Sequence, residues 1–113
     1  MAGTVSVSAG VQWSVSSGLF YWVLNDIARH TRDAGLAGHL TEIDRENLGW
    51  FGLDDITPGQ RCEVCDIITE RLVSDGEREL TADMLARPSA LELLADLVAK
   101  VSADAGPRVL PGR

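Results

Sequence analysis

Two cysteines with the spacing C-x-x-C form the clearest chemical motif of this 113-residue chain. Cys62 and Cys65 lie within RCEVCDIITERL, residues 61–72. Such a pair can hold a metal ion, act as a redox couple, or pack as two small apolar side chains. A redox pair needs its first cysteine at the N-terminus of a helix, because the helix dipole there lowers the thiol pKa.

The start of the surrounding helix distinguishes these roles. Thr57, Pro58 and Gln60 supply a capping threonine, a proline in the first helical position and a glutamine three residues after the cap. Cys62 then lies five residues into the helix, beyond most of the effect of the dipole. A helix that began after Gly59 would instead bring Cys62 into its first turn. Because free cysteine behaves as a small apolar residue, we expect both cysteines to pack in the core.

A metal or redox site is the alternative role for these cysteines. Zinc needs four ligands, and the two cysteines supply half of them. His30 and His39 complete a Cys2His2 set, although the spacings match no common zinc module. The alternative function is therefore a metal-binding or thiol-redox protein that uses Cys62, Cys65, His30 and His39, whereas the leading interpretation needs no cofactor.

Asp26 and His30 are a second pair whose types suit chemistry. They lie four residues apart, which places them on one face of a helix. A catalytic base that is oriented by Asp26 would also need a nucleophile, and the sequence contains no G-x-S-x-G motif. We expect an ordinary pair on the helix surface, and a protein that is not an enzyme.

Two aromatic residues in the turn-rich stretch GWFGLDD are candidates for partner binding. Trp50 and Phe51 are flanked by glycines and acids, which matches the apolar centre and polar rim of protein interfaces. Trp22 falls among the polar residues of its helix and can join them. The alternative is that Trp50 and Phe51 fold back into the core, which the small number of aromatic residues favours.

Acidic residues crowd the same stretch. Five of them accompany a single nearby arginine, Arg45: Glu42, Asp44, Glu46, Asp54 and Asp55. The spacing of a calcium-binding EF-hand loop is missing. We expect a solvated acidic surface, in which Glu46, Asp54 and Asp55 attract a basic protein partner.

The charge balance excludes other kinds of partner. Ten Lys and Arg against 17 Asp and Glu give a formal net charge of −7. Nucleic-acid affinity comes mostly from basic side chains, so we expect neither a nucleic acid nor a membrane surface as partner. No apolar run approaches the ~20 residues of a membrane span. Because the first basic residue is Arg29, no secretory leader is indicated, and we expect a cytoplasmic protein.

The elements that must position these residues begin with an N-terminal hairpin. TVSVSAGVQWSV alternates apolar and polar residues with period two. A loop over residues 8–10, with its glycine in the left-handed conformation, places Val5 opposite Trp13 and Val7 opposite Val11. All four side chains then share one face, which must pack on a helix or pair with another chain.

Helical periodicity and caps indicate the remaining elements. The expected segments are a helix over residues 18–34, a short helix from residue 41 or 44 to 49, a helix from 57 to about 73 that ends in a turn at SDGE, a short turn from Thr81 to Pro88, and a helix with a capping box at Ser89.

The sequence therefore predicts a mainly helical α+β fold, in which the hairpin packs on three main helices and one or two short ones. The alternative is an all-α protein whose N-terminal strand is shared in a dimer. We expect residues 1–103 to form a single globular domain and residues 104–113 to form a flexible tail. The expected function is a small acidic protein–protein interaction module, either an inhibitor or immunity-like protein or a self-associating homodimer.

Overall fold

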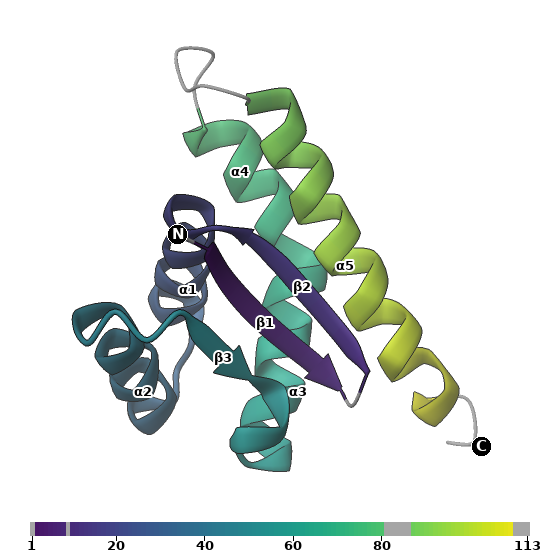
Figure 1. Ribbon diagram of the computed structural model, residues 1–113. Helices are drawn as coiled ribbons and strands as arrows, with labels where there is room; N and C mark the ends of the chain where they lie inside the picture. The colour runs from purple at the N-terminus through teal and green to yellow at the C-terminus, as the bar shows by residue number, and fades with distance from the viewer. Residues whose placement is uncertain (1, 9, 81–86, 110–113) are drawn as a thin grey trace.

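The protein has a mainly helical α+β fold, in which helices cover one face of a three-stranded sheet (Figure 1). The computed structural model describes residues 2–8, 10–80 and 87–109. The elements follow in the order β1 (Ala2–Ser8), β2 (Val11–Ser16), α1 (Ser17–His30), α2 (Ala34–Arg45), β3 (Trp50–Gly52), the 3-10 turn η1 (Leu53–Asp55), α3 (Pro58–Ile67), the π-turn η2 (Ile68–Leu72), α4 (Val73–Glu79) and α5 (Arg87–Val109). The expected fold class is confirmed. Within the described segments, no helix is both long enough and apolar enough to cross a membrane.

The N-terminal hairpin forms largely as expected. Val5 pairs with Trp13, and Gly10 has a φ of +80°, the left-handed conformation that the turn requires. The expected pairing of Val7 with Val11 is wrong, because the register shifts by one residue near the turn and Ser8 pairs with Val11 instead. Such a bulge leaves one residue of the strand without an opposite neighbour. Val7 still points into the core, where its side chain is fully buried.

A third strand, β3, was not anticipated. It runs parallel to β1, with Phe51 beside Val5, so β1 becomes the central strand in the order β2-β1-β3. A strand of three residues that ends in a glycine is too short to show the alternation that would predict it. Strand β2 already returns the chain to the end of the sheet where β1 begins, and the helices α1 and α2 then carry it to the other side of β1, where β3 starts in the same direction as β1.

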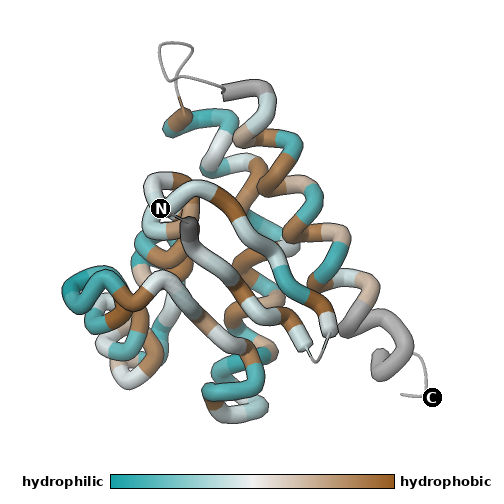
Figure 2. Tube along the Cα trace, in the orientation of Figure 1, coloured by the Kyte–Doolittle hydropathy of each residue, from teal (hydrophilic) through white to brown (hydrophobic). Residues whose placement is uncertain are grey.

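The core lies between the sheet and the helices behind it, where apolar residues recur along both layers (Figure 2). Phe20 of α1 and Trp13 of β2 are among its largest buried side chains. The indole N–H of Trp13 donates to the carbonyl of Leu93 in α5 at 2.8 Å. A buried tryptophan needs such a partner for its N–H, and this one fixes α5 against the hairpin.

The boundary between α1 and α2 corrects the expected helix over residues 18–34 and the short helix that starts at 41 or 44. Helix α1 ends at His30, and α2 begins at Ala34. Asp33 caps α2 by accepting a hydrogen bond from the N–H of Leu36 at 2.9 Å. Glu63 of α3 accepts hydrogen bonds from the hydroxyl of Thr31 and from the next backbone N–H. The carboxylate of Glu63 therefore replaces hydrogen-bond acceptors that a continuous helix would have provided.

The helix that begins at Pro58 is longer than expected. The predicted capping box is confirmed: the hydroxyl of Thr57 accepts from the N–H of Gln60, and the side chain of Gln60 accepts from the N–H of Thr57. The predicted turn at SDGE is wrong, because the helix continues through η2 and α4 to Glu79. Gly76 lies inside α4, where it meets α5 instead of turning the chain.

The C-terminal region is a single long helix. Because α5 begins at Arg87, the expected cap at Ser89 is wrong and Ser89 lies inside the helix. The short turn expected from Thr81 falls outside the described residues. The helical backbone continues to Val109, past the expected domain end at residue 103. The extent of the globular domain and the flexibility of the tail stay predictions.

Gly76 provides a test of the α4–α5 contact. A Cβ at this position would lie 2.6 Å from Cδ1 of Leu94, which is fully buried. Gly76→Ala should therefore lower the free energy of unfolding by roughly 1–3 kcal/mol, the usual cost of overpacking. Gly38→Ala in the open part of α2 is the matched control, and it should raise stability by about 0.5–1 kcal/mol through helix propensity. Urea denaturation measures both, and equal stabilisation by the two variants would contradict this packing.

Candidate functional site

The two adjacent aromatic residues of β3 have opposite environments. Phe51 is fully buried, whereas Trp50 is 44% exposed. Strand geometry explains the difference, because successive side chains point to opposite faces and Phe51 shares the core face with Val5. The expectation of Phe51 as a surface anchor is thereby corrected. Trp22 on α1 is half-buried and packs against the core.

The turn before β3 is held by Tyr21 of α1. The Tyr21 hydroxyl donates to Oδ1 of Asn47 at 2.9 Å and accepts from the N–H of Gly49 at 3.1 Å. Asn47 and Gly49 both have positive φ, 55° and 70°. Between them, the side chain of Leu48 is 59% exposed. The turn therefore presents Leu48 and Trp50 from a backbone that α1 fixes.

The three acids that were expected to attract a partner lie close to this turn in sequence, at the exposed surface. Glu46 pairs with its neighbour Arg45 at 3.3 Å. Asp54 pairs with Arg61 of α3 at 2.9 Å and keeps two-thirds of its side chain exposed (66%). Asp55 lies beside Trp50, since a Cβ at Gly52 would meet the carboxylate of Asp55 at 2.6 Å and the indole nitrogen of Trp50 at 3.2 Å.

The cysteines and histidines of the alternative function occupy separate places. Cys62 is exposed, which corrects the expectation that both thiols are core, and Cys65 is half-buried against the core. His39 is exposed on α2, with its ring 6.1 Å from that of Phe51. Among the described residues, one group brings three potential metal ligands within 4.8 Å of one another. Of the two cysteines and two histidines of the alternative function, this group contains only His30.

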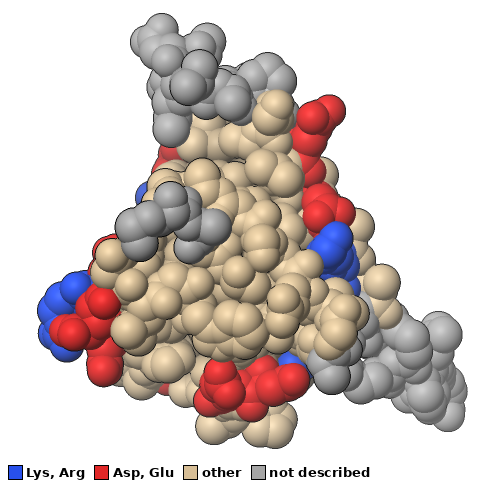
Figure 3. Space-filling view, in the orientation of Figure 1, with Lys and Arg blue, Asp and Glu red and all other residues tan. Residues whose placement is uncertain are grey.

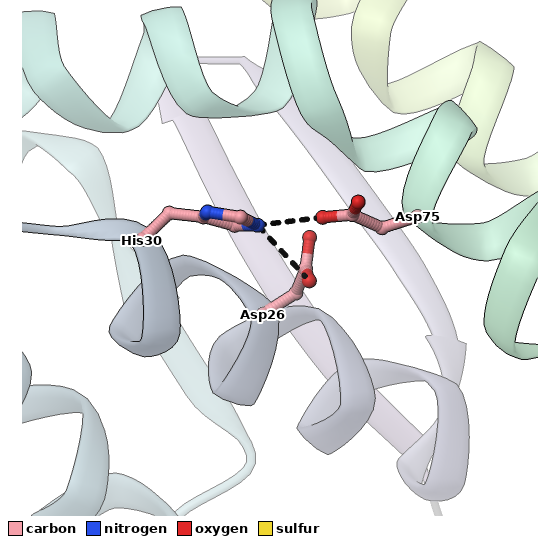
Figure 4. A group of neighbouring side chains, drawn as sticks. All are labelled: Asp26, His30 and Asp75. Atoms are coloured by element: carbon pink, nitrogen blue, oxygen red, sulfur yellow. Dashed lines mark hydrogen bonds and ion pairs between the residues drawn. The ribbon is translucent and has the colours of Figure 1, made fainter.

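That group joins His30 to two aspartates and is called the buried cluster below: Asp26, His30 and Asp75 (Figure 4). Helix α1 supplies Asp26 and His30, and α4 supplies Asp75. Nε2 of His30 lies 2.7 Å from Oδ2 of Asp75 and 3.7 Å from Oδ1 of Asp26. The two carboxylates are almost fully buried, while the side chain of His30 is 23% exposed. The sequence predicted Asp26 on the helix surface, and this prediction is wrong because the side chain is buried.

Two arginines stabilise the buried cluster from its exposed side. Arg29 binds Oδ1 of Asp26, and it also binds Glu79 of α4 at 2.7 Å. Arg78 binds Oδ1 of Asp75. Each carboxylate thus keeps one oxygen on an arginine and has the other oxygen inside the cluster, where Oδ2 of Asp75 contacts His30. Together these contacts join the end of α1 to α4.

The pKa values of the two buried aspartates, Asp26 and Asp75, shift in opposite directions. The pKa of Asp26 is raised from its usual 3.8 to about 6, mainly by burial and next by a hydrogen bond to Asp75, while Arg29 opposes the rise. Burial alone would also raise the pKa of Asp75, but hydrogen bonds from Asp26, His30 and Arg78 together lower it. Only a protonated Asp26 can donate to Asp75, because two ionised carboxylates have no proton between them.

Helical spacing offered a signal for both buried acids. Asp26 lies seven residues after Leu19, nearly two full turns, so it falls close to the apolar sector of α1 rather than opposite it. Asp75 lies seven residues after Ile68 and three after Leu72, both fully buried, and so continues the apolar stripe of its helix. An acid on an apolar stripe indicates a buried carboxylate, but periodicity alone does not say what faces it.

The raised pKa of Asp26 predicts a pH-dependent stability. A folded pKa above the usual value means that the folded state holds the proton more tightly, so the stabilisation is complete below pH 3.8 and is lost as the pH rises through about 6. The shift corresponds to at most about 3 kcal/mol. We expect the free energy of unfolding of the wild type, measured in urea with EDTA, to fall between pH 4 and 7 relative to that of Asp26→Asn.

The control for this experiment is Asp96→Asn on α5. Asp96 is an exposed carboxylate that pairs with Lys100 at 2.9 Å, outside the buried cluster. Its stability profile should run parallel to that of the wild type. The lowered pKa of Asp75 has the opposite sign, and its effect falls below pH 3.8, outside the measured range. Parallel profiles for Asp26→Asn and the wild type would contradict the raised pKa.

Comparison with known proteins does not assign this chain to a family. No family model, no curated protein and no solved structure matches it. The function is therefore inferred below from the contacts, burial and charges of its own residues.

Proposed function

We propose that this protein is a non-enzymatic interaction module that binds a basic protein partner through the surface around Leu48 and Trp50. The observation that carries the proposal is the exposure of Trp50, 44%, on a strand whose next residue is fully buried. A large aromatic side chain that stays half in solvent on a fixed strand suits an anchor of a protein interface. Leu48, at 59% exposure, extends the apolar area.

The fixed turn favours binding because little conformational freedom is lost when a partner binds. The two hydrogen bonds of the Tyr21 hydroxyl hold Asn47 and Gly49 on either side of Leu48. Immobilising a flexible loop upon binding costs free energy, and a turn that is already held avoids most of that cost. The apolar anchors are therefore displayed in a single arrangement.

The outer edge of β3 adds backbone groups that can recognise a partner. The N–H of Thr4 donates to the carbonyl of Gly49 at 3.0 Å, so residues 49 and 51 point their backbone groups toward β1. The backbone groups of Trp50 and Gly52 consequently point away from β1. In the described sheet, β3 is an edge strand. An extended peptide can pair with such an edge while Trp50 contacts its side chains.

The exposed face of the sheet and its surroundings define the chemistry of the partner. Figure 3 shows this face as largely free of charged side chains, with groups of Asp and Glu along its borders. Ser14, Thr4 and Trp50 form one row across the three strands. Asp55 lies beside Trp50 at the end of this row. A basic side chain of the partner can thus reach a carboxylate next to the aromatic anchor.

A second copy of the chain is a less suitable occupant than a basic protein. Self-association through this edge would bring the acidic borders of two molecules together, and each carries a formal net charge of −7. Like charges across an interface are unfavourable. An inhibitor or immunity-like role is one form of binding to a basic protein, and it is supported by size and charge alone.

Trp50→Ala is the direct test of the proposal. Immobilised wild type and variants would be compared for capture of a protein from the lysate of the source cells, with the bound amount quantified at low and high salt. We expect Trp50→Ala to reduce capture at least about tenfold, the effect of losing an interface hot spot. Added salt should weaken capture by the wild type, because a basic partner is attracted by charge.

Leu93→Ala is the matched control, because Leu93 is also an exposed apolar residue (37%) but lies on α5. Its capture should equal that of the wild type. Thermal unfolding should show Trp50→Ala folded, whereas Phe51→Ala should lose roughly 3–5 kcal/mol as a core truncation. Equal capture by Trp50→Ala and the wild type would exclude this surface. A dimer in sedimentation that Trp50→Ala dissociates would replace the basic partner by a second copy.

A further inference from the structure

The buried cluster contains an oxygen that its hydrogen bonds do not satisfy. Oδ2 of Asp26 is buried, and while the carboxylate is ionised no group of the described residues donates a hydrogen bond to it. The side chain of Asp26 is completely buried, at 0% exposure, so solvent does not reach it. A buried carboxylate oxygen without a donor is unfavourable. A bound cation or proton would satisfy it.

The arrangement of the two carboxylates directs their remaining oxygens to one point. Arg29 occupies Oδ1 of Asp26, and Arg78 occupies Oδ1 of Asp75. Oδ2 of Asp75 faces Nε2 of His30 at 2.7 Å. Figure 4 shows the second oxygen of Asp26 directed toward the space between His30 and Asp75. One atom from each of the three residues can thus meet in a single place, all within 4.8 Å of one another.

We propose that Asp26, His30 and Asp75 bind one divalent transition-metal ion of the zinc class. Carboxylate oxygens and imidazole nitrogens are both zinc ligands, and three protein ligands leave a fourth position open for water. The imidazole argues against Mg²⁺ and Ca²⁺, which prefer oxygen ligands alone and more of them. The proposal is independent of the partner-binding surface, which uses other residues.

The surrounding charges are compatible with a bound cation. The arginines Arg29 and Arg78 stay on the outer oxygens, where they orient the carboxylates as residues behind metal ligands commonly do. Glu79 offsets part of their charge through its contact with Arg29 at 2.7 Å. With a neutral His30, the three acids and two arginines carry a net charge of −1. The side chain of His30 is 23% exposed, which gives an ion a way in from solvent.

Metal binding would change one hydrogen bond in the buried cluster. Nε2 of His30 donates to an ionised Asp75 in the present arrangement, because a carboxylate without a proton can only accept. An ion would take the place of that proton, and the neutral imidazole would then carry its proton on Nδ1. The bound ion would join α1 to α4 more firmly than the hydrogen bond does, and binding should weaken as the pH falls.

The test measures Zn²⁺ affinity in a protein without thiols. The Cys62→Ser/Cys65→Ser double variant is freed of metal with a chelator, and Zn²⁺ is titrated against a chromophoric competitor at pH 7.5. We expect one Zn²⁺ per chain. Adding Asp26→Asn or His30→Gln to this background should weaken binding at least about tenfold. Adding His39→Gln should leave the affinity unchanged, because His39 is exposed and outside the buried cluster.

A second measurement uses the unmodified chain and does not depend on the folding of any variant. Co²⁺ is added to the wild type, and its visible and near-ultraviolet absorption and the imidazole NMR signals of His30 and His39 are recorded. Bands of a four- or five-coordinate ion without a thiolate charge-transfer band, together with a shift of His30 alone, would support the site. A thiolate band would instead place the ion on the cysteines.

Several outcomes would overturn the proposal. Zinc binding that disappears in the double cysteine variant would assign the metal to Cys62 and Cys65. Binding that Asp26→Asn leaves intact, in a variant shown to be folded by circular dichroism, would remove Asp26 from the site. The absence of Zn²⁺ and Co²⁺ binding to the wild type would leave a proton, shared between Asp26 and Asp75, as the occupant of this position.

Discussion

The close approach of Phe20 to the backbone of Gly3 orients α1, and both candidate sites depend on that orientation. A Cβ at position 3 would lie only 2.1 Å from the phenyl ring, so the ring sits where only glycine leaves room. Phe20 thereby points straight at the sheet. At about 100° per residue, Tyr21 lies to one side of this direction and His30 lies about 80° to the other. One contact thus directs Tyr21 toward the turn before β3 and His30 toward α4.

The two regions that α1 orients differ in how water affects their charges. Around Trp50 the acids are exposed, so solvent and salt weaken their attraction, and they act mainly by guiding a charged partner. In the buried cluster, Asp26 is shielded from solvent, so the gain or loss of one hydrogen-bond or ion partner changes the free energy of its carboxylate strongly. The exposed region suits recognition of a protein, and the buried one suits a tightly held proton or ion.

Local patterns predicted the parts of the fold that depend on neighbouring residues. Alternation and a glycine turn predicted the hairpin except for the bulge at Val7, and the capping box at Thr57 was confirmed because caps are made within one turn. Sequence patterns failed to predict the helix boundaries that depend on contacts with residues distant in the sequence. Glu63 stabilises the break after His30, Leu94 packs on Gly76 within a continuous helix, and neither contact is visible in local sequence. Periodicity also does not predict the π-helical segment η2.

For the candidate sites, the sequence by itself determined which residue types were available: acidic residues near two aromatic residues, two thiols, and Asp26 four residues before His30. Only the tertiary structure decided their roles. It buried Phe51 beside Val5 and left Trp50 outside, because adjacent residues of a strand face opposite sides. It also brought Asp75 to within 2.7 Å of His30 across 45 residues of chain, because the apolar faces of α1 and of the helix that leads into α4 pack in the same core. Side-chain chemistry is a property of the sequence, whereas its solvent exposure and its partners are set by packing.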